Sequence, residues 1–246
     1  MRTVNKVEAA VVLDQLVTMT RAIGDPVHDY VILGEGNTSA RVDEDTFWVK
    51  ASGVCMADAD ARAFLRVRLH DVLAILDALP LSEHEVRARL AAAKADPDAP
   101  GSPSIETAMH ALCLSLGNAT FVGHTHPTAL NGILCAQGAE AAFAGYIFPA
   151  EALVCGEPLF VPYAPPGQPL AQAVHEGLLT YNDRYGQPPR VILLQNHGLV
   201  ALGPTPQAVL DVTAMMVRAA RILLGTYALG GPHFIEPSRG LAGTTN

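Results

Sequence analysis

The chain has 246 residues, of which half are hydrophobic and 16% are charged, and its formal net charge is −8. This length and apolar content suit one large domain with a substantial core. The acidic balance and the absence of a basic run argue against nucleic acid as a partner. No apolar stretch is long enough to span a bilayer. The four cysteines lack CxxC spacing and the first residues lack a signal-peptide core, so we expect a soluble protein of the reducing cytoplasm.

The first half of the chain predicts a helix followed by strands. Apolar residues recur at helical spacing across residues 12–23, and Gly24 is predicted to end that helix. The part that follows is rich in β-formers, and four strands are predicted in it: residues 28–33, 38–42, 46–50 and 63–69. The acidic turn 43–45 makes a hairpin of the second and third of these strands.

Helices are predicted next, and they define one domain. Residues 70–79 carry helical periodicity, Ser82 to Glu85 has the capping-box form, and Pro103 opens a third helix. The loop 96–101 is rich in Pro, Gly and Asp, but it is too short to imply a domain boundary. We therefore expect a single domain over residues 1–229 and a polar, disordered tail over residues 230–246.

The second half of the chain returns to strands and ends with a helix. The predicted elements are a strand at 121–126, short β segments through Val161, a helix at 170–185, a buried strand at 191–194 and its partner at 199–202. A final helix starts after the cap Thr205, with Pro206 in its first turn, and is predicted to end at Gly225. This alternation predicts a sheet covered by helices on both faces.

Three histidines give the strongest chemical signal. His124 and His126 stand two residues apart on a predicted strand, so their side chains project to the same face. His197 follows a second buried strand. Three neutral imidazoles leave a fourth position for water or substrate, which is the pattern of catalytic zinc. An isolated HxH pair is more often explained by core packing, and the third histidine is what favours a metal site.

Other polar residues allow two interpretations each. Glu106 lies in the first turn of its helix, where it either complements the helix dipole or serves as a general acid/base beside a metal. His110, one turn later, orients Glu106 or simply packs. The glycine-rich turns 34–39 and 50–53 offer backbone N–H groups and Asn, Ser and Lys side chains that suit an anion such as phosphate, although each alone is an ordinary turn.

Five short motifs occur in a fixed order along the chain. They are Gly36-Asn37-Thr38-Ser39, Lys50-Ala51-Ser52-Gly53, Pro103-Ser104-Ile105-Glu106, His124-Thr125-His126-Pro127 and Asn196-His197-Gly198. Their order and spacing resemble those of the class II aldolase/adducin family, which includes fuculose-phosphate and rhamnulose-phosphate aldolases and ribulose-phosphate 4-epimerase. The resemblance covers nearly the whole chain, from the first predicted helix to about Gly225.

The resemblance implies an α/β/α sandwich with a mainly antiparallel central sheet, assembled as a homotetramer with active sites between subunits. It implies the following site residues: His124, His126 and His197 as zinc ligands, Glu106 as acid/base, Asn37, Ser52, Gly53 and Ser104 as phosphate contacts, and Tyr146 as a proton donor. Imidazole ligands also suit Mn²⁺ or Co²⁺, so the metal is Zn²⁺ or another divalent ion.

One departure from the family pattern concerns the substrate anion. The phosphate-binding aldolases place a hydroxyl residue before the carboxylate, where this chain has Ile105. Isoleucine donates no hydrogen bond. Lys50 either compensates or is a surface residue of an exposed strand. The substrate then carries a phosphate, a carboxylate or no anion.

These observations predict a zinc-dependent aldehyde-lyase that cleaves or forms a C–C bond in a small hydroxyketone, such as a sugar phosphate or sugar acid, through a metal-stabilised enediolate. The alternative is a metal-dependent decarboxylase, dehydratase or epimerase of a keto-sugar acid or its phosphate, because all of these reactions need a polarised carbonyl. A non-catalytic, adducin-like interaction module is disfavoured, since the three ligands and the carboxylate are all present.

Overall fold

The computed structural model describes residues 6–235, and a seven-stranded sheet runs through its centre. The strand order is β3-β2-β1-β4-β7-β6-β5, and every neighbouring pair is antiparallel except β5 and β6. The strands are β1 (Asn37–Arg41), β2 (Thr46–Lys50), β3 (Phe64–Arg68), β4 (Phe121–Thr125), β5 (Leu159–Val161), β6 (Val191–Leu194) and β7 (Gly198–Gly203). The predicted, mainly antiparallel α/β architecture is confirmed.

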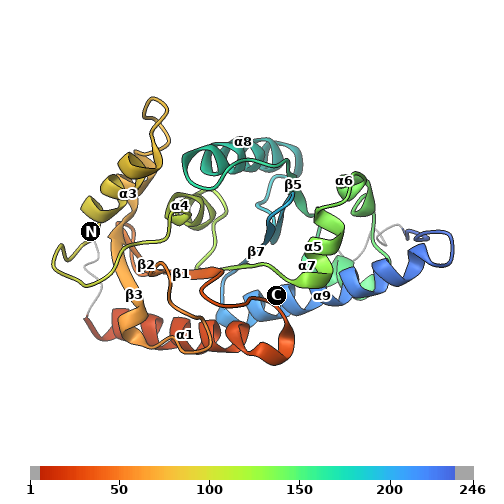
Figure 1. Ribbon diagram of the computed structural model, residues 1–246, viewed down its shortest axis with the longest axis horizontal. Helices are drawn as coiled ribbons and strands as arrows, with labels where there is room; N and C mark the ends of the chain where they lie inside the picture. The colour runs from red at the N-terminus through yellow and green to blue at the C-terminus, as the bar shows by residue number, and fades with distance from the viewer. Residues whose placement is uncertain (1–5, 236–246) are drawn as a thin grey trace.

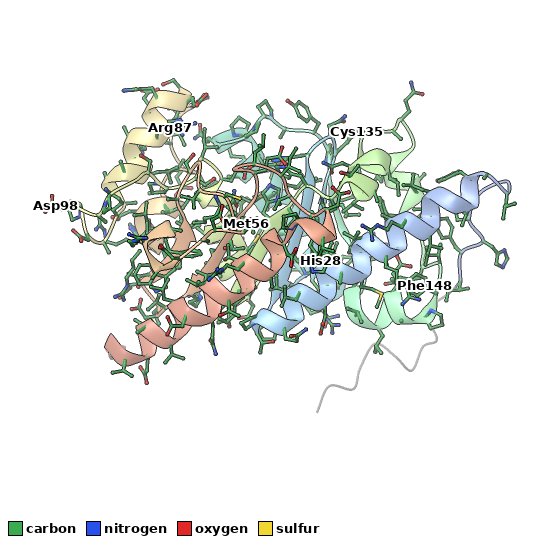
Figure 2. All side chains as sticks on the ribbon, turned by 60° about the horizontal axis from the view of Figure 1, so that its bottom comes forward. His28, Met56, Arg87, Asp98, Cys135 and Phe148 are labelled. Atoms are coloured by element: carbon green, nitrogen blue, oxygen red, sulfur yellow. The ribbon has the colours of Figure 1, made fainter. Side chains whose placement is uncertain are left out.

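Helices cover both faces of this sheet (Figure 1). The long helices α1 and α9 lie side by side across one face, as Figure 2 shows from their side, together with α5 and α7. The other face carries α2, α3, α4 and α8. The helices are α1 (Lys6–Gly24), α2 (Leu69–Leu73), α3 (Glu83–Ala92), α4 (Thr107–Ser115), α5 (Thr128–Leu134), α6 (Ala139–Ala142), α7 (Pro149–Cys155), α8 (Gln168–Tyr185) and α9 (Pro206–Tyr227).

The two cores follow from the alternation of side chains along the strands. In β6, Val191 and Leu193 pack toward α1 and α9, whereas Ile192 and Leu194 pack toward α4 and α8. All four residues are buried, which explains why this strand is a continuous apolar run. In β4, Phe121 and Val122 join the two cores, and the buried polar residues His124 and Thr125 follow at the end of the strand.

The predicted strand at 28–33 is wrong. The structure has a single 3₁₀ turn at Pro26–His28, followed by irregular chain. Asp29 and Leu33 adopt positive φ values of 57° and 52°, which no regular strand allows. Ile32 and Leu33 are 60% and 80% exposed, so their apolar character does not reflect burial in this chain.

Residues 127–158 also differ from prediction, because three short helices replace the expected β segments. Pro149 occupies the first turn of α7, where its fixed φ favours a helix start. Helix α2 ends at Leu73 rather than at residue 79, and α9 continues through Gly225 to Tyr227. The remaining predicted strands and helices lie within a few residues of their expected positions.

Only part of the predicted tail over residues 230–246 can be compared with the structure, because residues 236–246 lie outside the described residues. Residues 230–235 are described, and the Ile235 N–H donates a 2.8 Å hydrogen bond to the Tyr146 carbonyl. Over residues 6–235, no helix is both long and apolar enough to cross a membrane.

Candidate metal centre

Three strand ends bring the histidines together. His124 is the fourth residue of β4, between β1 and β7, and His126 follows directly after β4. His197 stands in the tight turn between β6 and β7, where Asn196 adopts a left-handed φ of 54°. Asn131 donates a 2.9 Å hydrogen bond to the His197 carbonyl, so α5 also holds this turn.

The imidazoles converge through their Nε2 atoms. His124 Nε2 lies 3.0 Å from His126 Nε2 and 3.3 Å from His197 Nε2. In the described part of the chain, this is the one group of three or more His, Cys, Asp or Glu side chains whose ligand atoms all lie within 4.8 Å of one another. Two imidazole ligands of a tetrahedral zinc ion are about 3.3 Å apart, given Zn–N bonds of about 2.0–2.1 Å. The spacing therefore fits a shared divalent cation.

The tautomer of His124 also fits a metal ligand. Its Nδ1 donates a 2.9 Å hydrogen bond to the Leu199 carbonyl, which can only accept. The proton is thus on Nδ1, and the Nε2 lone pair points into the cluster. Burial lowers the pKa of His124 to about 3 and also lowers the pKa of His126. Both rings are neutral at pH 7, which is the form that binds metals.

Glu106 closes the cluster on one side. It lies at the N-cap of α4 and is buried. Its Oε1 is 3.0 Å from His197 Nε2, and its Oε2 is 3.4 Å from His124 Nε2. Burial raises the pKa of Glu106, but His124, His197 and an amide donor from Asn37 together lower it by more. The carboxyl is therefore ionised.

A buried chain of hydrogen bonds holds this carboxylate. Asn37 Nδ2 donates to Glu106 Oε2 at 2.8 Å and to Ser104 Oγ at 3.2 Å. The side-chain amide oxygen of Asn37 accepts from His110 Nε2, and His110 Nδ1 accepts from Ser39 Oγ at 2.7 Å. The structure thus links the His110 ring to the Glu106 carboxylate through Asn37.

The second glycine-rich turn lies next to the first, and Lys50 is buried beneath it. Lys50 is 1% exposed, so the surface alternative is wrong. Its Nζ donates to the carbonyls of Ala51 and Val54, at 3.2 and 2.5 Å, and burial lowers the pKa of Lys50 to about 8. The Ser52 N–H donates a hydrogen bond to the Ser102 carbonyl. A Cβ added at Gly53 would meet nothing within 4 Å. The turn therefore borders open space.

Tyr146 lies away from the histidines in this chain. Its hydroxyl donates a 3.2 Å hydrogen bond to Glu157, next to a small cavity lined by residues of α7 and α9. Burial raises the pKa of Tyr146, and Glu157 raises it further. A larger groove of about 850 Å³ runs along β5 and α8, and no histidine of the cluster lines it. The role of Tyr146 as proton donor stays a prediction.

Sequence reasoning missed two polar partners of the site. Ser39 is the hydrogen-bond partner of His110, and Glu35 Oε2 lies 3.4 Å from His126 Nδ1. Both belong to the turn 34–39, for which the sequence suggested only the binding of an anion. The alternation of side chains along β1 was the available signal, because it puts Asn37 and Ser39 on the face that α4 covers.

A helix-covered, mainly antiparallel sheet with three imidazoles at its strand ends and a carboxylate at the start of α4 defines an α/β protein with a candidate metal centre. Residues 14–224 match the sequence model of the class II aldolase and adducin N-terminal domain, so the chain belongs to that family. The resemblance stated from the motifs is confirmed.

Several solved structures have a fold similar to that of this chain. The N-terminal class II aldolase domain of a conserved Thermoplasma acidophilum protein is 28% identical, with a TM-score of 0.68 over 86% of this chain and 93% of that one. YgbL from Klebsiella pneumoniae, described as a putative aldolase/epimerase/decarboxylase, is 18% identical, with a TM-score of 0.67 over 95% and 96% of the two chains. An L-fuculose 1-phosphate aldolase is 16% identical, with a TM-score of 0.66 over 92% and 91%.

A curated relative shares part of its length with this chain. The protein named uncharacterized oxidoreductase YuxG, from Bacillus subtilis, is 29% identical over 195 residues, which are 76% of this chain and 26% of that protein. The chain thus spans about a quarter of the length of this relative.

Proposed function

We propose that this protein is a metal-dependent lyase of the class II aldolase type, which cleaves or forms a C–C bond in a small hydroxyketone. The observation that carries the proposal is the convergence of three imidazole Nε2 atoms next to an ionised, buried carboxylate. An adducin-like interaction module would need neither the metal ligands nor the carboxylate. Their joint presence therefore favours an enzyme.

The donor set fits a divalent cation. His124, His126 and His197 would hold it, and Zn²⁺ is our first candidate, with Mn²⁺ and Co²⁺ as alternatives. Such a cation supplies Lewis-acid polarisation of a substrate carbonyl and offsets negative charge on its oxygen. His124 Nε2, whose lone pair points inward, lies 3.0 Å from His126 Nε2 and 3.3 Å from His197 Nε2, which are separations that suit ligands sharing one cation.

Glu106 is the group that moves the proton. Its carboxylate is ionised, so it can accept a proton from a hydroxyl or a carbon next to the substrate carbonyl and later return it. Asn37 orients Oε2 through a 2.8 Å hydrogen bond, and this leaves Oε1 on the side of His197. The carboxylate is thereby aimed at the point where a substrate would meet the cluster.

The structure leaves few residues that could bind a substrate anion. The Lys50 ammonium already donates hydrogen bonds to two backbone carbonyls, and the Ile105 side chain cannot donate one. The Ser52–Gly53 turn and Ser104 are the remaining candidates for a phosphate or carboxylate. A sugar phosphate or a sugar acid is therefore our proposed substrate class, within carbohydrate metabolism. Decarboxylase, dehydratase or epimerase chemistry on the same carbonyl is the alternative, and YgbL carries a description that includes two of these reactions.

The test is stereospecific deuterium exchange, followed by NMR, into dihydroxyacetone phosphate, dihydroxyacetone and glycolaldehyde. Zinc-loaded protein is compared with the Glu106→Gln variant, which keeps the shape of the side chain but cannot accept the proton. We expect exchange into one donor by the wild type and none by the variant. Zinc-loaded wild-type protein that exchanges none of the three would contradict the aldolase assignment, and keto-sugar acids would then be assayed for loss of CO₂ or water.

We also propose a cytoplasmic homotetramer with active sites between subunits. Ile32 and Leu33 support the assembly, because these exposed apolar side chains could pack against another subunit. They lie just before Glu35, which contacts His126. Light scattering coupled to size-exclusion chromatography measures the assembly. A monomer at micromolar concentration would contradict it.

A further inference from the structure

A carboxylate contacts the outer edge of one metal-ligating ring. Glu35 Oε2 lies 3.4 Å from His126 Nδ1, and the Glu35 side chain is 42% exposed. The three rings differ in this respect. His124 Nδ1 donates to a buried carbonyl, whereas His197 Nδ1 is buried and has no hydrogen-bond partner among the described residues. Among the described residues, Glu35 is thus the acidic side chain that contacts the outer edge of a ring of the cluster.

The backbone fixes where this carboxylate sits. Glu35 stands between Gly34 and Gly36, and its N–H donates a 3.1 Å hydrogen bond to the Ile32 carbonyl. Gly36 has a φ of +65°, and a Cβ added there would lie 2.7 Å from the His124 carbonyl oxygen. A Cβ at Gly34 would lie 3.2 Å from the Gly53 carbonyl oxygen. The turn therefore packs against both β4, at His124, and the second glycine-rich turn, at Gly53.

His126 itself is tied to the same segment. Its N–H donates a 2.9 Å hydrogen bond to the Tyr30 carbonyl, four residues before Gly34. Residues 30–36 therefore contact both the backbone and the ring of His126. His126 follows the last residue of β4, and its ring Nδ1 faces Glu35 Oε2 at 3.4 Å. This contact restrains the rotation of the ring.

The chemistry of the contact determines the tautomer. Carboxylate oxygens accept hydrogen bonds, so Glu35 favours a proton on His126 Nδ1 and leaves the Nε2 lone pair available to bind a cation. Such partners raise the basicity of a ligating imidazole and fix its orientation, and losing one typically costs about 10–100-fold in metal affinity.

We propose that Glu35 is a positioning residue of the metal centre, which holds His126 with its Nε2 lone pair in the cluster and thereby sets the affinity for a divalent cation. This inference rests on the proposed function only in requiring that the three histidines bind a cation. It does not depend on the reaction or on the substrate.

The experiment measures zinc affinity by competition with a chromophoric chelator, in the absence of substrate. Glu35→Ala is expected to bind zinc about 10–100-fold more weakly than the wild type. Glu35→Gln keeps an acceptor oxygen without the charge, so its affinity should be intermediate. Glu44→Ala is the matched control, because Glu44 is an exposed acid in the 43–45 turn and its removal changes the net charge equally. Its affinity should equal that of the wild type.

Two further measurements separate positioning from general damage. Thermal unfolding of the metal-free variants should match the wild type, since Glu35 is half-exposed. ¹⁵N NMR of the zinc-loaded protein, in which Nε2 binds the cation, should show the His126 Nδ1–H exchanging with water more slowly in the wild type than in Glu35→Ala. Glu35→Ala with wild-type zinc affinity, or with a loss no greater than that of Glu44→Ala, would overturn the proposal. Tight zinc binding without deuterium exchange would instead count only against the proposed function.

Discussion

The side-chain amide of Asn37 donates a 2.8 Å hydrogen bond to Glu106 Oε2, across 69 positions of sequence. The same nitrogen donates to Ser104, and the amide oxygen is occupied by His110. The sequence motif that contains Asn37 suggested a contact with substrate phosphate. In the structure, the Asn37 amide nitrogen bonds the Glu106 carboxylate, and we propose that Asn37 orients this carboxylate.

Replacing Asn37 by Ala distinguishes these two roles. If Asn37 orients Glu106, the maximal exchange rate at saturating donor should fall by about tenfold or more, because the lost hydrogen bond to a charged group is worth about 1.5–3 kcal/mol. The KM for phosphorylated and unphosphorylated donors should change alike. A rise in KM confined to the phosphorylated donor, with an unchanged maximal rate, would assign Asn37 to phosphate binding instead.

His126→Ala and Glu106→Gln should separate metal binding from turnover. The first variant removes one of three imidazoles, so tight zinc binding and turnover should both be lost. The second keeps all three imidazoles, and we expect it to retain zinc while losing turnover. Metal content after dialysis, measured by plasma emission spectrometry, together with the exchange rate, checks both expectations. Full zinc retention by His126→Ala would refute the ligand assignment.

The sequence predicted the regular parts of the fold because their signals are local. The capping box from Ser82 to Glu85 forms as expected, with both hydrogen bonds present, and the apolar run of β6 is buried on both faces. The segment 28–33 was mispredicted because Val31 and Ile32 have strand propensity, while the left-handed residues Asp29 and Leu33 on either side prevent strand pairing. Tertiary context overrides such propensities.

The candidate site was predictable in its ligands but not in its supporting contacts. The spacing of His124 and His126, and the position of His197 after a buried strand, were enough to place three imidazoles together. The contact of Glu35 with His126 depends on how the chain turns at Gly34 and Gly36, which no spacing rule describes. Likewise, the burial of Lys50 follows from the path of residues 51–54 over it, not from its own strand.

Gly198→Ala should damage the metal centre through backbone crowding. A Cβ at Gly198 would lie 2.3 Å from the Thr125 carbonyl oxygen and 2.7 Å from His126 Cδ2. The end of β4 must then shift, so we expect zinc affinity to fall at least tenfold and stability to fall by about 1–3 kcal/mol. Chelator competition and urea unfolding measure the two effects.

Gly225→Ala is the control for this substitution. Gly225 lies within α9, and a Cβ there would meet nothing within 4 Å. Alanine should therefore stabilise the protein by about 0.5–1 kcal/mol and leave zinc affinity unchanged. Destabilisation at this position would instead support the predicted end of the helix at Gly225.

The stability of the metal-free protein should fall as the pH drops below 6.5, because two buried histidines resist protonation. Burial lowers the pKa of His124 to about 3 and that of His110 to about 4, from 6.5 in the unfolded chain. Between these limits the unfolded state binds protons that the folded state does not. Stability is thus complete above pH 6.5 and is lost progressively as the pH falls toward the folded pKa values.

The size of this loss can be measured before the carboxyl groups titrate. Linkage predicts that the two histidines together reduce the free energy of unfolding by about 3 kcal/mol between pH 6.5 and 5. His126, whose pKa is also lowered by burial, adds to the loss. Urea unfolding at half-unit pH steps, with a chelator present, gives the slope. His110→Gln should remove the contribution of one histidine from that slope, whatever its effect on stability at pH 7. A stability that stays constant from pH 6.5 to 5 would show that these rings accept protons in the folded state.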